Sequence, residues 1–324
     1  MAGASRDPKV TAMRAARLHE IGGNLQIDTV EDSVPGDGEV LVDMAYAAVN
    51  PLDIWISRGA PGTAAANLPW VPGTEGTGHV DGRPVLVSGG GIGVVRQGLY
   101  QEKAVVPAGA VMELPDGTDL AQAAGIGVAG VTAWNTLHDR AALRADDRVL
   151  VLGASGGVGS LAVQLAHAAG AVVWGQTTHA DKTATIYEGG ADRVVVTDAG
   201  GLVGAVAELE PTVILDGLGG AYTAASVEAL VPLGRLVVYG TSADVESTLN
   251  LRVLYRKAVS LLGYGGLVVA DDERRRVLTD LLAQVAAGTL RVPVELVPLD
   301  QAADCLRRIL ERGLTGKLVL DARA

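Results

Sequence analysis

A glycine-rich turn is the stretch of this chain whose residue types and spacing could do chemistry. The apolar run 149–152 is too short for a helix and is bounded by glycine, which is typical of a buried parallel strand. The turn has A-x-G-x-x-G spacing, and 160–169 is predicted to form the helix that follows. Gly156 would let the backbone approach a pyrophosphate, and Gly159 would let the helix pack closely on its strand. We therefore predict a bound dinucleotide at Ala154, Ser155, Gly156, Gly157, Val158 and Gly159.

The same turn also matches a motif of hydrolytic enzymes. Gly153, Ser155 and Gly157 fit the G-x-S-x-G nucleophile elbow of α/β-hydrolases, which also sits between a strand and a helix. That fold needs an acid and then a histidine downstream of the serine. The last histidine is His179, and no Asp or Glu separates it from Ser155. The required order cannot be built, which argues strongly against a hydrolase.

Composition and charge narrow the function further. The 324 residues favour two domains, and 48% hydrophobic with 19% charged residues is typical of a globular protein. A net charge of −11 argues against nucleic acid or an anionic membrane as partner. The single cysteine, Cys305, excludes an intrachain disulfide and a multi-cysteine metal site. The first nine residues lack the apolar core of a signal peptide, and no run reaches a membrane span, so we expect a cytoplasmic protein.

The chain first shows strand patterns and then alternates strands with helices. The first part is predicted to hold strands at 13–18, 25–30, 39–49, 84–88 and 101–106, with 59–78 as loop. Helices are expected at 118–124 and 128–137. Six strands then follow at 149–152, 171–175, 193–196, 212–215, 234–239 and 257–263, with helices between most of them. This pattern predicts an α/β protein with a doubly wound parallel (Rossmann) sheet beside a mostly β domain, closed by helices 271–287 and 301–311 and strands 294–298 and 317–320.

Several segments along the chain carry a family resemblance: AAVNPLDIWISRG (47–59), VPGTEGTG (71–78), GVTAWNTL (130–137), GRLVVYG (234–240) and GLTGKLVLD (313–321). In these segments the chain resembles the zinc-free quinone-oxidoreductase (zeta-crystallin-like) branch of the medium-chain dehydrogenase/reductase superfamily. The resemblance implies a GroES-like catalytic domain at 1–122 and 267–324 and a Rossmann domain at 123–266. It also implies a homodimer joined at the sixth strand, near 257–263.

The resemblance also bears on metal. Zinc-dependent relatives place a His before the Glu of a GHE motif and a Cys in the strand that ends here at 47–49. This chain has Gly73-Thr74-Glu75 and no Cys there. Carboxylates alone are a poor match for zinc, so we predict no metal site.

The end of the second predicted strand indicates the coenzyme. Enzymes that use NAD hold the ribose 2′-hydroxyl with an acid about 20 residues beyond the turn, but none occurs here before Asp181. Thr178, His179 and Lys182 could instead contact a 2′-phosphate, as hydroxyls and a lysine do at matching family positions. The alternative is that Lys182 only solvates a helix face. We predict NADPH as coenzyme.

Several further positions follow from the resemblance or from the sheet. In relatives, the residues matching Asn50 and Thr132 lie beside the nicotinamide, although here they could be only a helix cap and a polar residue in a buried helix. Tyr239, Gly240 and Tyr264 follow the fifth and sixth strands, at the edge where ligands bind. Tyr46 and Tyr264 are possible proton donors. Lys317 is either near the coenzyme or a surface charge.

These residues predict a zinc-independent, NADPH-dependent reductase acting on a small molecule, a quinone or another activated alkene or carbonyl. An acryloyl-CoA-like or biosynthetic enoyl reductase is the first alternative, because 89–101 resembles the acryloyl-CoA reductase branch. Pro61 counts against the enoyl-thioester reductases that carry a Tyr at that position. A protein that binds NADPH without turnover is the second alternative.

Overall fold

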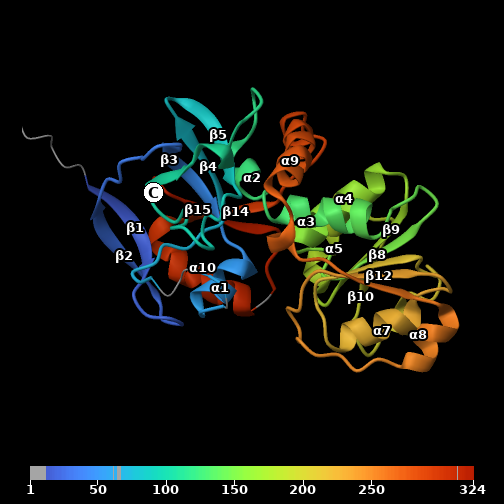
Figure 1. The fold of residues 1–324 in the computed structure, drawn as a ribbon. Coiled ribbons are helices and arrows are strands. Elements are labelled where there is room, and N and C mark those ends of the chain that lie inside the picture. The colour runs from blue at the N-terminus through green and yellow to red at the C-terminus, as the bar shows by residue number, and fades with distance from the viewer. Residues whose placement is uncertain (1–11, 61, 64–66, 312) are drawn as a thin grey trace, which may run out of the picture. The chain divides into compact units, whose positions relative to one another are not determined.

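The computed structural model describes residues 12–60, 62–63, 67–311 and 313–324 (Figure 1). Pro61 and the N-terminal segment, on which two of the interpretations above rest, lie outside the described residues. The chain forms two compact units. The first unit contains the described residues up to Leu114 together with 296–311 and 318–324. The second unit contains 115–295 and 313–317. Among the described residues, no helix combines the length and apolar character needed to cross a bilayer.

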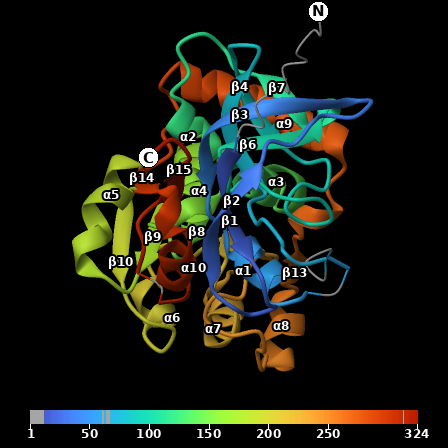
Figure 2. The same ribbon diagram turned by 90° about the vertical axis from the view of Figure 1, so that its left-hand side faces the viewer.

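The first unit is mostly β, as expected. Strands β1 and β2 pair as an antiparallel hairpin (Figure 2), and a second sheet runs in the order β14-β15-β3-β4-β5-β7, with β6 also paired to β3. The strands are β1 (Ala12–Leu18), β2 (Leu25–Glu31), β3 (Glu39–Ala48), β4 (Glu75–Val80), β5 (Arg83–Ser88), β6 (Lys103–Pro107), β7 (Val111–Glu113), β14 (Val294–Pro298) and β15 (Lys317–Asp321). Helices α1 (Pro51–Ser57) and α10 (Ala302–Glu311) pack against each other in this unit.

Strand β4 corrects one prediction, because 59–78 was expected to be loop throughout. Glycine has low strand propensity, so the presence of Gly76 and Gly78 made this segment look like a loop in the sequence. The glycines are needed because β4 approaches β3 closely: a Cβ on Gly76 would lie 2.5 Å from the Tyr46 carbonyl oxygen. The pairing of β3 with β4 also shifts register between Met44 and Tyr46, as at a β-bulge.

The second unit has the predicted doubly wound sheet. Its strands run in the order β10-β9-β8-β11-β12-β13, and every pair is parallel. The strands are β8 (Arg148–Val151), β9 (Val172–Thr177), β10 (Arg193–Val196), β11 (Val213–Asp216), β12 (Arg235–Val238) and β13 (Ser260–Gly263). The order reverses beside β8, the strand that leads into the glycine-rich turn, and ligands of open α/β sheets bind at such a point.

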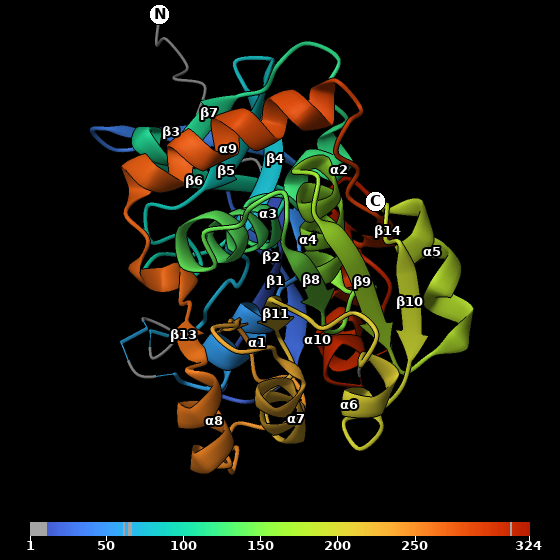
Figure 3. The same cartoon turned by 90° about the vertical axis from the view of Figure 1, so that its right-hand side faces the viewer.

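Helices cover both faces of this sheet (Figure 3). One face packs its buried apolar side chains against α6 (Leu202–Ala205), α7 (Ala221–Ala229) and α8 (Leu251–Lys257). The other carries α3 (Ala129–Asn135), α4 (Gly157–Ala168) and α5 (Thr183–Glu188). Helices α2 (Leu120–Ala124) and α3 also contact α9 (Asp271–Ala286).

Two elements begin three residues away from the start expected from sequence. The predicted sixth strand, 257–263, begins only at Ser260, because the preceding residues complete α8 and Ala258 ends that helix in a left-handed conformation (φ 49°). Helix α4 begins at Gly157, not at residue 160, because glycines occupy its first turn without breaking it.

The compact units also differ from the expected domain boundaries. Residues 115–122 and 267–295 belong to the second unit, whereas we expected them in the first. The contacts of α9 with α2 and α3 account for this difference. The division into a catalytic and a coenzyme-binding domain stays a prediction.

Candidate functional site

The glycine-rich turn joins β8 to α4 and is fixed by its neighbour β9. Gly153 has φ +62°, a conformation that favours glycine. The Ala154 amide donates to the Gln176 carbonyl oxygen (2.9 Å), which ties the turn to the adjacent strand. A Cβ on Gly159 would overlap the Gly153 carbonyl oxygen and lie 2.8 Å from the Ala154 Cα. Gly159 is therefore required for the close packing of α4 on the turn, as the spacing predicted.

Gln176 supports the glycine-rich turn, and sequence reasoning missed it. Its side chain is 1% exposed, its Oε1 accepts from the Gly153 amide (3.0 Å), and its Nε2 donates to the Thr197 carbonyl oxygen (2.6 Å). The side chain thus links the glycine-rich turn to the residue after β10. The signal was an amide side chain within an otherwise buried strand, since buried polar groups need partners.

The start of α4 suits a negatively charged ligand. Among the described residues, no side chain caps this helix at Gly156, and its first turn contains no acidic residue. The first backbone N–H groups of a helix lack intrahelical partners, and the helix dipole places partial positive charge there. A pyrophosphate would fit both features.

The segment at 313–317 lies against this turn. The Gly316 amide donates to the Ser155 carbonyl oxygen (2.8 Å), and Gly156 and Gly316 form a β-bridge. Lys317 is 5% exposed, and a Cβ on Gly157 would lie 2.7 Å from its Cδ. Of the two roles proposed for Lys317, the one near the predicted coenzyme turn is therefore favoured over a surface charge.

The candidates for a 2′-phosphate lie at the end of β9. Thr178 and His179 are exposed, whereas Lys182 is 7% exposed and its ammonium donates to the Leu314 carbonyl oxygen (3.1 Å). A Cβ on Gly313 would lie 3.9 Å from Lys182 Nζ and 4.0 Å from His179 Nε2, so both side chains face that glycine. Burial lowers the pKa of Lys182, partly offset by Asp181. A buried ammonium group whose hydrogen bond goes to a neutral carbonyl oxygen would be stabilised by an anion placed beside it, such as a 2′-phosphate.

Tyr239 and Gly240 come directly after β12, at the carboxyl edge of the sheet. A Cβ on Gly217 would lie 2.7 Å from the Tyr239 ring, so this ring covers the turn after β11. Burial and then the nearby Asp216 raise the Tyr239 pKa, so its hydroxyl stays protonated. Gly240 is equally close to that turn, with a Cβ there 2.8 Å from the Gly217 carbonyl oxygen.

Thr132 and Tyr264 are brought together in the second unit, with Asn135 beside them. Burial raises the Tyr264 pKa, and the side chains of Thr132 and Asn135 and the charge of Arg274 counteract this. Thr132 is 8% exposed and Asn135 is 2% exposed. Sequence reasoning did not single out Asn135, which lies one helical turn beyond Thr132 on α3.

Asn50 and Tyr46 belong to the first unit. The Asn50 Nδ2 donates to Glu75 Oε1 (2.8 Å), and the Asn50 amide donates to Asp53 Oδ2 (2.8 Å). Tyr100 also donates to Asp53 Oδ2 (2.8 Å), and burial followed by the charge of Asp53 raises the Tyr100 pKa. Asn50 therefore caps α1 and also presents a side chain whose orientation Glu75 fixes.

Tyr46, one of the two candidate proton donors, is engaged elsewhere in the first unit. Its hydroxyl accepts from Arg323 Nη2 (2.7 Å), and the Arg323 guanidinium lies 4.9 Å from the ring centroid. A cation beside this hydroxyl is a partner for its oxygen and not a proton acceptor.

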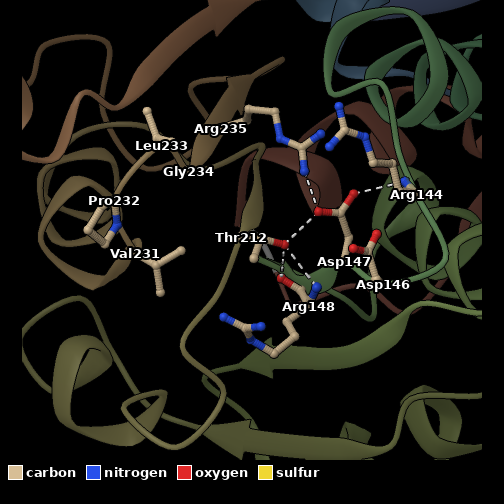
Figure 4. A pocket seen from close by; sticks show the side chains of 10 residues that line it. All are labelled: Arg144, Asp146, Asp147, Arg148, Thr212, Val231, Pro232, Leu233, Gly234 and Arg235. Atoms are coloured by element: carbon tan, nitrogen blue, oxygen red, sulfur yellow. Dashed lines mark hydrogen bonds and ion pairs between the residues drawn. The ribbon is translucent and has the colours of Figure 1, made fainter.

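A cavity of about 430 Å³ lies at the amino ends of β8, β11 and β12, the edge opposite the glycine-rich turn (Figure 4). Asp147 is its central residue: it accepts from the Arg144 amide (2.8 Å) and the Thr212 hydroxyl (2.7 Å) and pairs with Arg235. These contacts tie together three strand starts. We interpret this cluster as structural.

No group of three or more His, Cys, Asp or Glu side chains in the described part of the chain could hold a metal ion. Glu75, which occupies the position of the zinc-family motif, is fully buried and bonded to Asn50. The positions where zinc-dependent relatives have His and Cys ligands are therefore occupied by other residues in this chain.

A doubly wound parallel sheet with an uncapped glycine-rich turn, next in sequence to a β-rich unit, defines a protein of the dehydrogenase class. The alcohol dehydrogenase GroES-like domain model matches residues 36–116, and the zinc-binding dehydrogenase model matches 157–284. The pig (Sus scrofa) quinone oxidoreductase is 31% identical over 95% of this chain and 97% of its own length. The chain belongs to the medium-chain dehydrogenase/reductase superfamily, in its quinone oxidoreductase branch, and is an oxidoreductase.

Solved structures agree with this assignment. The quinone oxidoreductase from Thermus thermophilus, solved also as its complex with NADPH, has a TM-score of 0.83 at 28% identity, covering 95% of this chain and all of its own. The cobalt- and zinc-bound alcohol dehydrogenase from Pyrobaculum aerophilum also has a TM-score of 0.83, at 30% identity, covering 96% of this chain and all of its own. The fold is therefore shared by metal-containing and quinone-reducing relatives.

Proposed function

We propose that this protein is a zinc-independent reductase that uses NADPH to reduce a quinone or another activated alkene or carbonyl. The observation that carries the proposal is the uncapped start of α4, beside a glycine-rich turn held by Gln176 and covered by 313–317. The likeness to quinone oxidoreductases, one of them solved with NADPH, supports the choice of coenzyme and acceptor.

The chain's own residues bind and orient the reactants in this proposal. The N–H groups of Gly157, Val158 and Gly159 bind the pyrophosphate, and Lys182 with Thr178 and His179 binds the 2′-phosphate. Asn50, held by Glu75, and Thr132 position the nicotinamide, which supplies a hydride when bound. Tyr264 is favoured over Tyr46 as the hydroxyl that faces the acceptor, because it follows β13 at the carboxyl edge of the sheet, where ligands of such sheets bind.

The donor set supports independence from zinc. The residues present at the family's zinc position are Thr74 and Glu75, and zinc sites are built from Cys and His with at most some carboxylates. The bond from Asn50 already uses one oxygen of Glu75. Activity is therefore expected to be unchanged by EDTA.

Oxidation of NADPH tests the proposed function, with NADH as coenzyme control and EDTA present throughout. A small quinone and crotonyl-CoA are compared as acceptors. Quinone turnover with NADPH supports the proposal. Faster turnover of the thioester would assign the protein to the acyl-CoA alternative, and binding of NADPH without turnover of any acceptor would favour a binding role.

Replacing Lys182 with methionine should change the coenzyme preference. Methionine keeps the apolar stem but removes the ammonium that lies beside His179 and Gly313. Loss of a charged hydrogen bond, worth about 1.5–3 kcal/mol, should raise the KM for NADPH roughly 10- to 100-fold. The KM for NADH serves as the control and should stay within about twofold. Equal changes for both coenzymes would argue that Lys182 only supports the fold.

We also propose a homodimer joined at β13. This strand ends the sheet order, and an unpaired strand edge is a template for pairing with a second chain. Leu261 on β13 is 45% exposed, as expected of a side chain that a partner covers. Light scattering should give the mass of two chains, and Leu261→Arg should give the mass of one. If the unmutated protein is a monomer, the proposal is wrong.

The cytoplasmic location expected from the sequence stays a prediction.

A further inference from the structure

Three buried polar atoms without a hydrogen bond gather in the second unit, and one of them, Arg274 Nε, lies 4.0 Å from the carboxylate of Asp271. In the part of the chain that the structure describes, no hydrogen bond reaches Asn135 Oδ1, the Tyr264 hydroxyl or Arg274 Nε, although all three are buried. The Tyr264 hydroxyl interacts with the side chains of Thr132 and Asn135 without full hydrogen-bond geometry. Buried polar atoms without partners cost about 1–3 kcal/mol each, so a cluster of them calls for an explanation.

The elements that carry this cluster place it at the ligand edge of the sheet. Tyr264 comes directly after β13, and its amide donates to the Val238 carbonyl oxygen at the end of β12 (2.9 Å). Ligands of doubly wound sheets bind outside the carboxyl ends of the strands. Asn135 is the last residue of α3, and a π-helical turn, Thr136–Arg140, begins directly after it. Such turns occur frequently at functional sites.

We propose that the Tyr264 hydroxyl donates a hydrogen bond to the carbonyl oxygen of the substrate, and that Asn135 is the residue that positions it. This inference rests on the proposed function and deepens it, because it requires an acceptor in which negative charge develops on an oxygen. Quinones and enones meet that requirement.

The chemistry balances with this donor. The substrate gains a hydride, which carries two electrons and one proton, and the resulting negative charge gathers on its carbonyl oxygen. Tyr264 stabilises that charge by hydrogen bonding, and one proton from solvent neutralises it. Burial raises the Tyr264 pKa, so the hydroxyl keeps its proton near neutral pH and can donate. The Asn135 Nδ2 group can donate to the Tyr264 oxygen, which fits the lowering of the Tyr264 pKa by this side chain, so it holds the tyrosine in place and leaves the hydroxyl proton for the substrate.

The first test removes only the hydroxyl, by Tyr264→Phe. We expect kcat with a quinone to fall by roughly 10²-fold, the usual cost of losing one preorganised donor, with NADPH affinity unchanged. Tyr255→Phe is the matched control, since Tyr255 is 70% exposed on α8, and it should leave kcat unchanged. If the parent protein turns over no quinone, the proposed function fails. If the parent is active and Tyr264→Phe equals it, only this inference fails.

The second test asks whether Asn135 acts through Tyr264. Asn135→Leu should lower kcat about 10-fold alone but cause no further loss in the Tyr264→Phe background, because residues acting as a unit are not additive. If the double variant instead shows the product of the two single losses in kcat, Asn135 does not act through Tyr264. Asn135→Asp, which has the same shape, should be active only at low pH, because an ionised carboxylate draws the tyrosine proton toward itself. A pH profile like that of the parent would overturn the proposal.

A binding measurement provides a readout independent of turnover. In the presence of NADP⁺, 4-nitrophenol serves as a probe whose absorbance reports ionisation of a phenol oxygen. A donor at that oxygen favours the phenolate, so the bound probe should ionise at lower pH in the parent than in Tyr264→Phe. Burial of the probe affects both proteins alike. An identical titration in the two proteins would show that Tyr264 does not reach the substrate oxygen.

Discussion

Asp147→Ala is expected to lower the free energy of unfolding by about 2–4 kcal/mol, because it leaves a largely buried guanidinium without its charge partner. Asp147 is 5% exposed, and its carboxylate contacts Arg235, the Thr212 hydroxyl and the Arg144 amide (Figure 4). These groups belong to the starts of β8, β11 and β12 or to the residues before them. Removing the carboxylate therefore weakens three parallel strands at once.

The neighbouring residue provides a matched control for this variant. Asp146 has the same side chain but is exposed, so Asp146→Ala should change stability by no more than about 0.5 kcal/mol. Urea denaturation measures both variants. The loss in Asp147→Ala should be similar with and without NADPH, because the cluster lies at the edge opposite the glycine-rich turn. Equal stabilities of the two variants would contradict the structural role of Asp147.

The doubly wound sheet could be predicted because parallel strands buried on both faces are continuous apolar runs. Runs such as 149–152 and 193–196 occur at regular spacing and fall within a residue of β8 and β10. Strand β4 could not be predicted, because the glycines that let it approach β3 also remove its strand signal. A close backbone approach is a property of two strands, and one strand's sequence does not contain it.

Some residues of the candidate site could likewise be predicted from the sequence, and others could not. The glycine-rich turn depends on local spacing, and the structure places Gly159 where that spacing requires it. Gln176 and Asn135 were missed because their importance depends on what lies beside them in the fold. Gln176 is one polar residue within a buried strand, and Asn135 sits among the apolar residues of α3. Only the assembled unit shows that one holds the turn and that the other faces Tyr264.

Gly159→Ala is expected to reduce NADPH affinity by more than about 100-fold, close to 3 kcal/mol. The added methyl group would overlap the Gly153 carbonyl oxygen and lie 2.8 Å from the Ala154 Cα. Both neighbours are backbone atoms, so α4 must move away from the turn, and the first N–H groups of the helix move with it. Anion binding at a helix start depends on those groups, because the dipole effect falls off within the first turn.

A second glycine separates this effect from a general intolerance of alanine. Apart from its chain neighbours and the backbone of its own helix, no described atom lies within 4 Å of a Cβ on Gly204 in α6, so Gly204→Ala should leave NADPH affinity unchanged and raise stability slightly. Fluorescence titration with NADPH measures affinity, and thermal unfolding without coenzyme measures stability. If Gly159→Ala loses stability but binds NADPH as the parent does, the pyrophosphate does not sit at this turn. If it is folded and binds weakly, the geometry of the turn determines coenzyme binding.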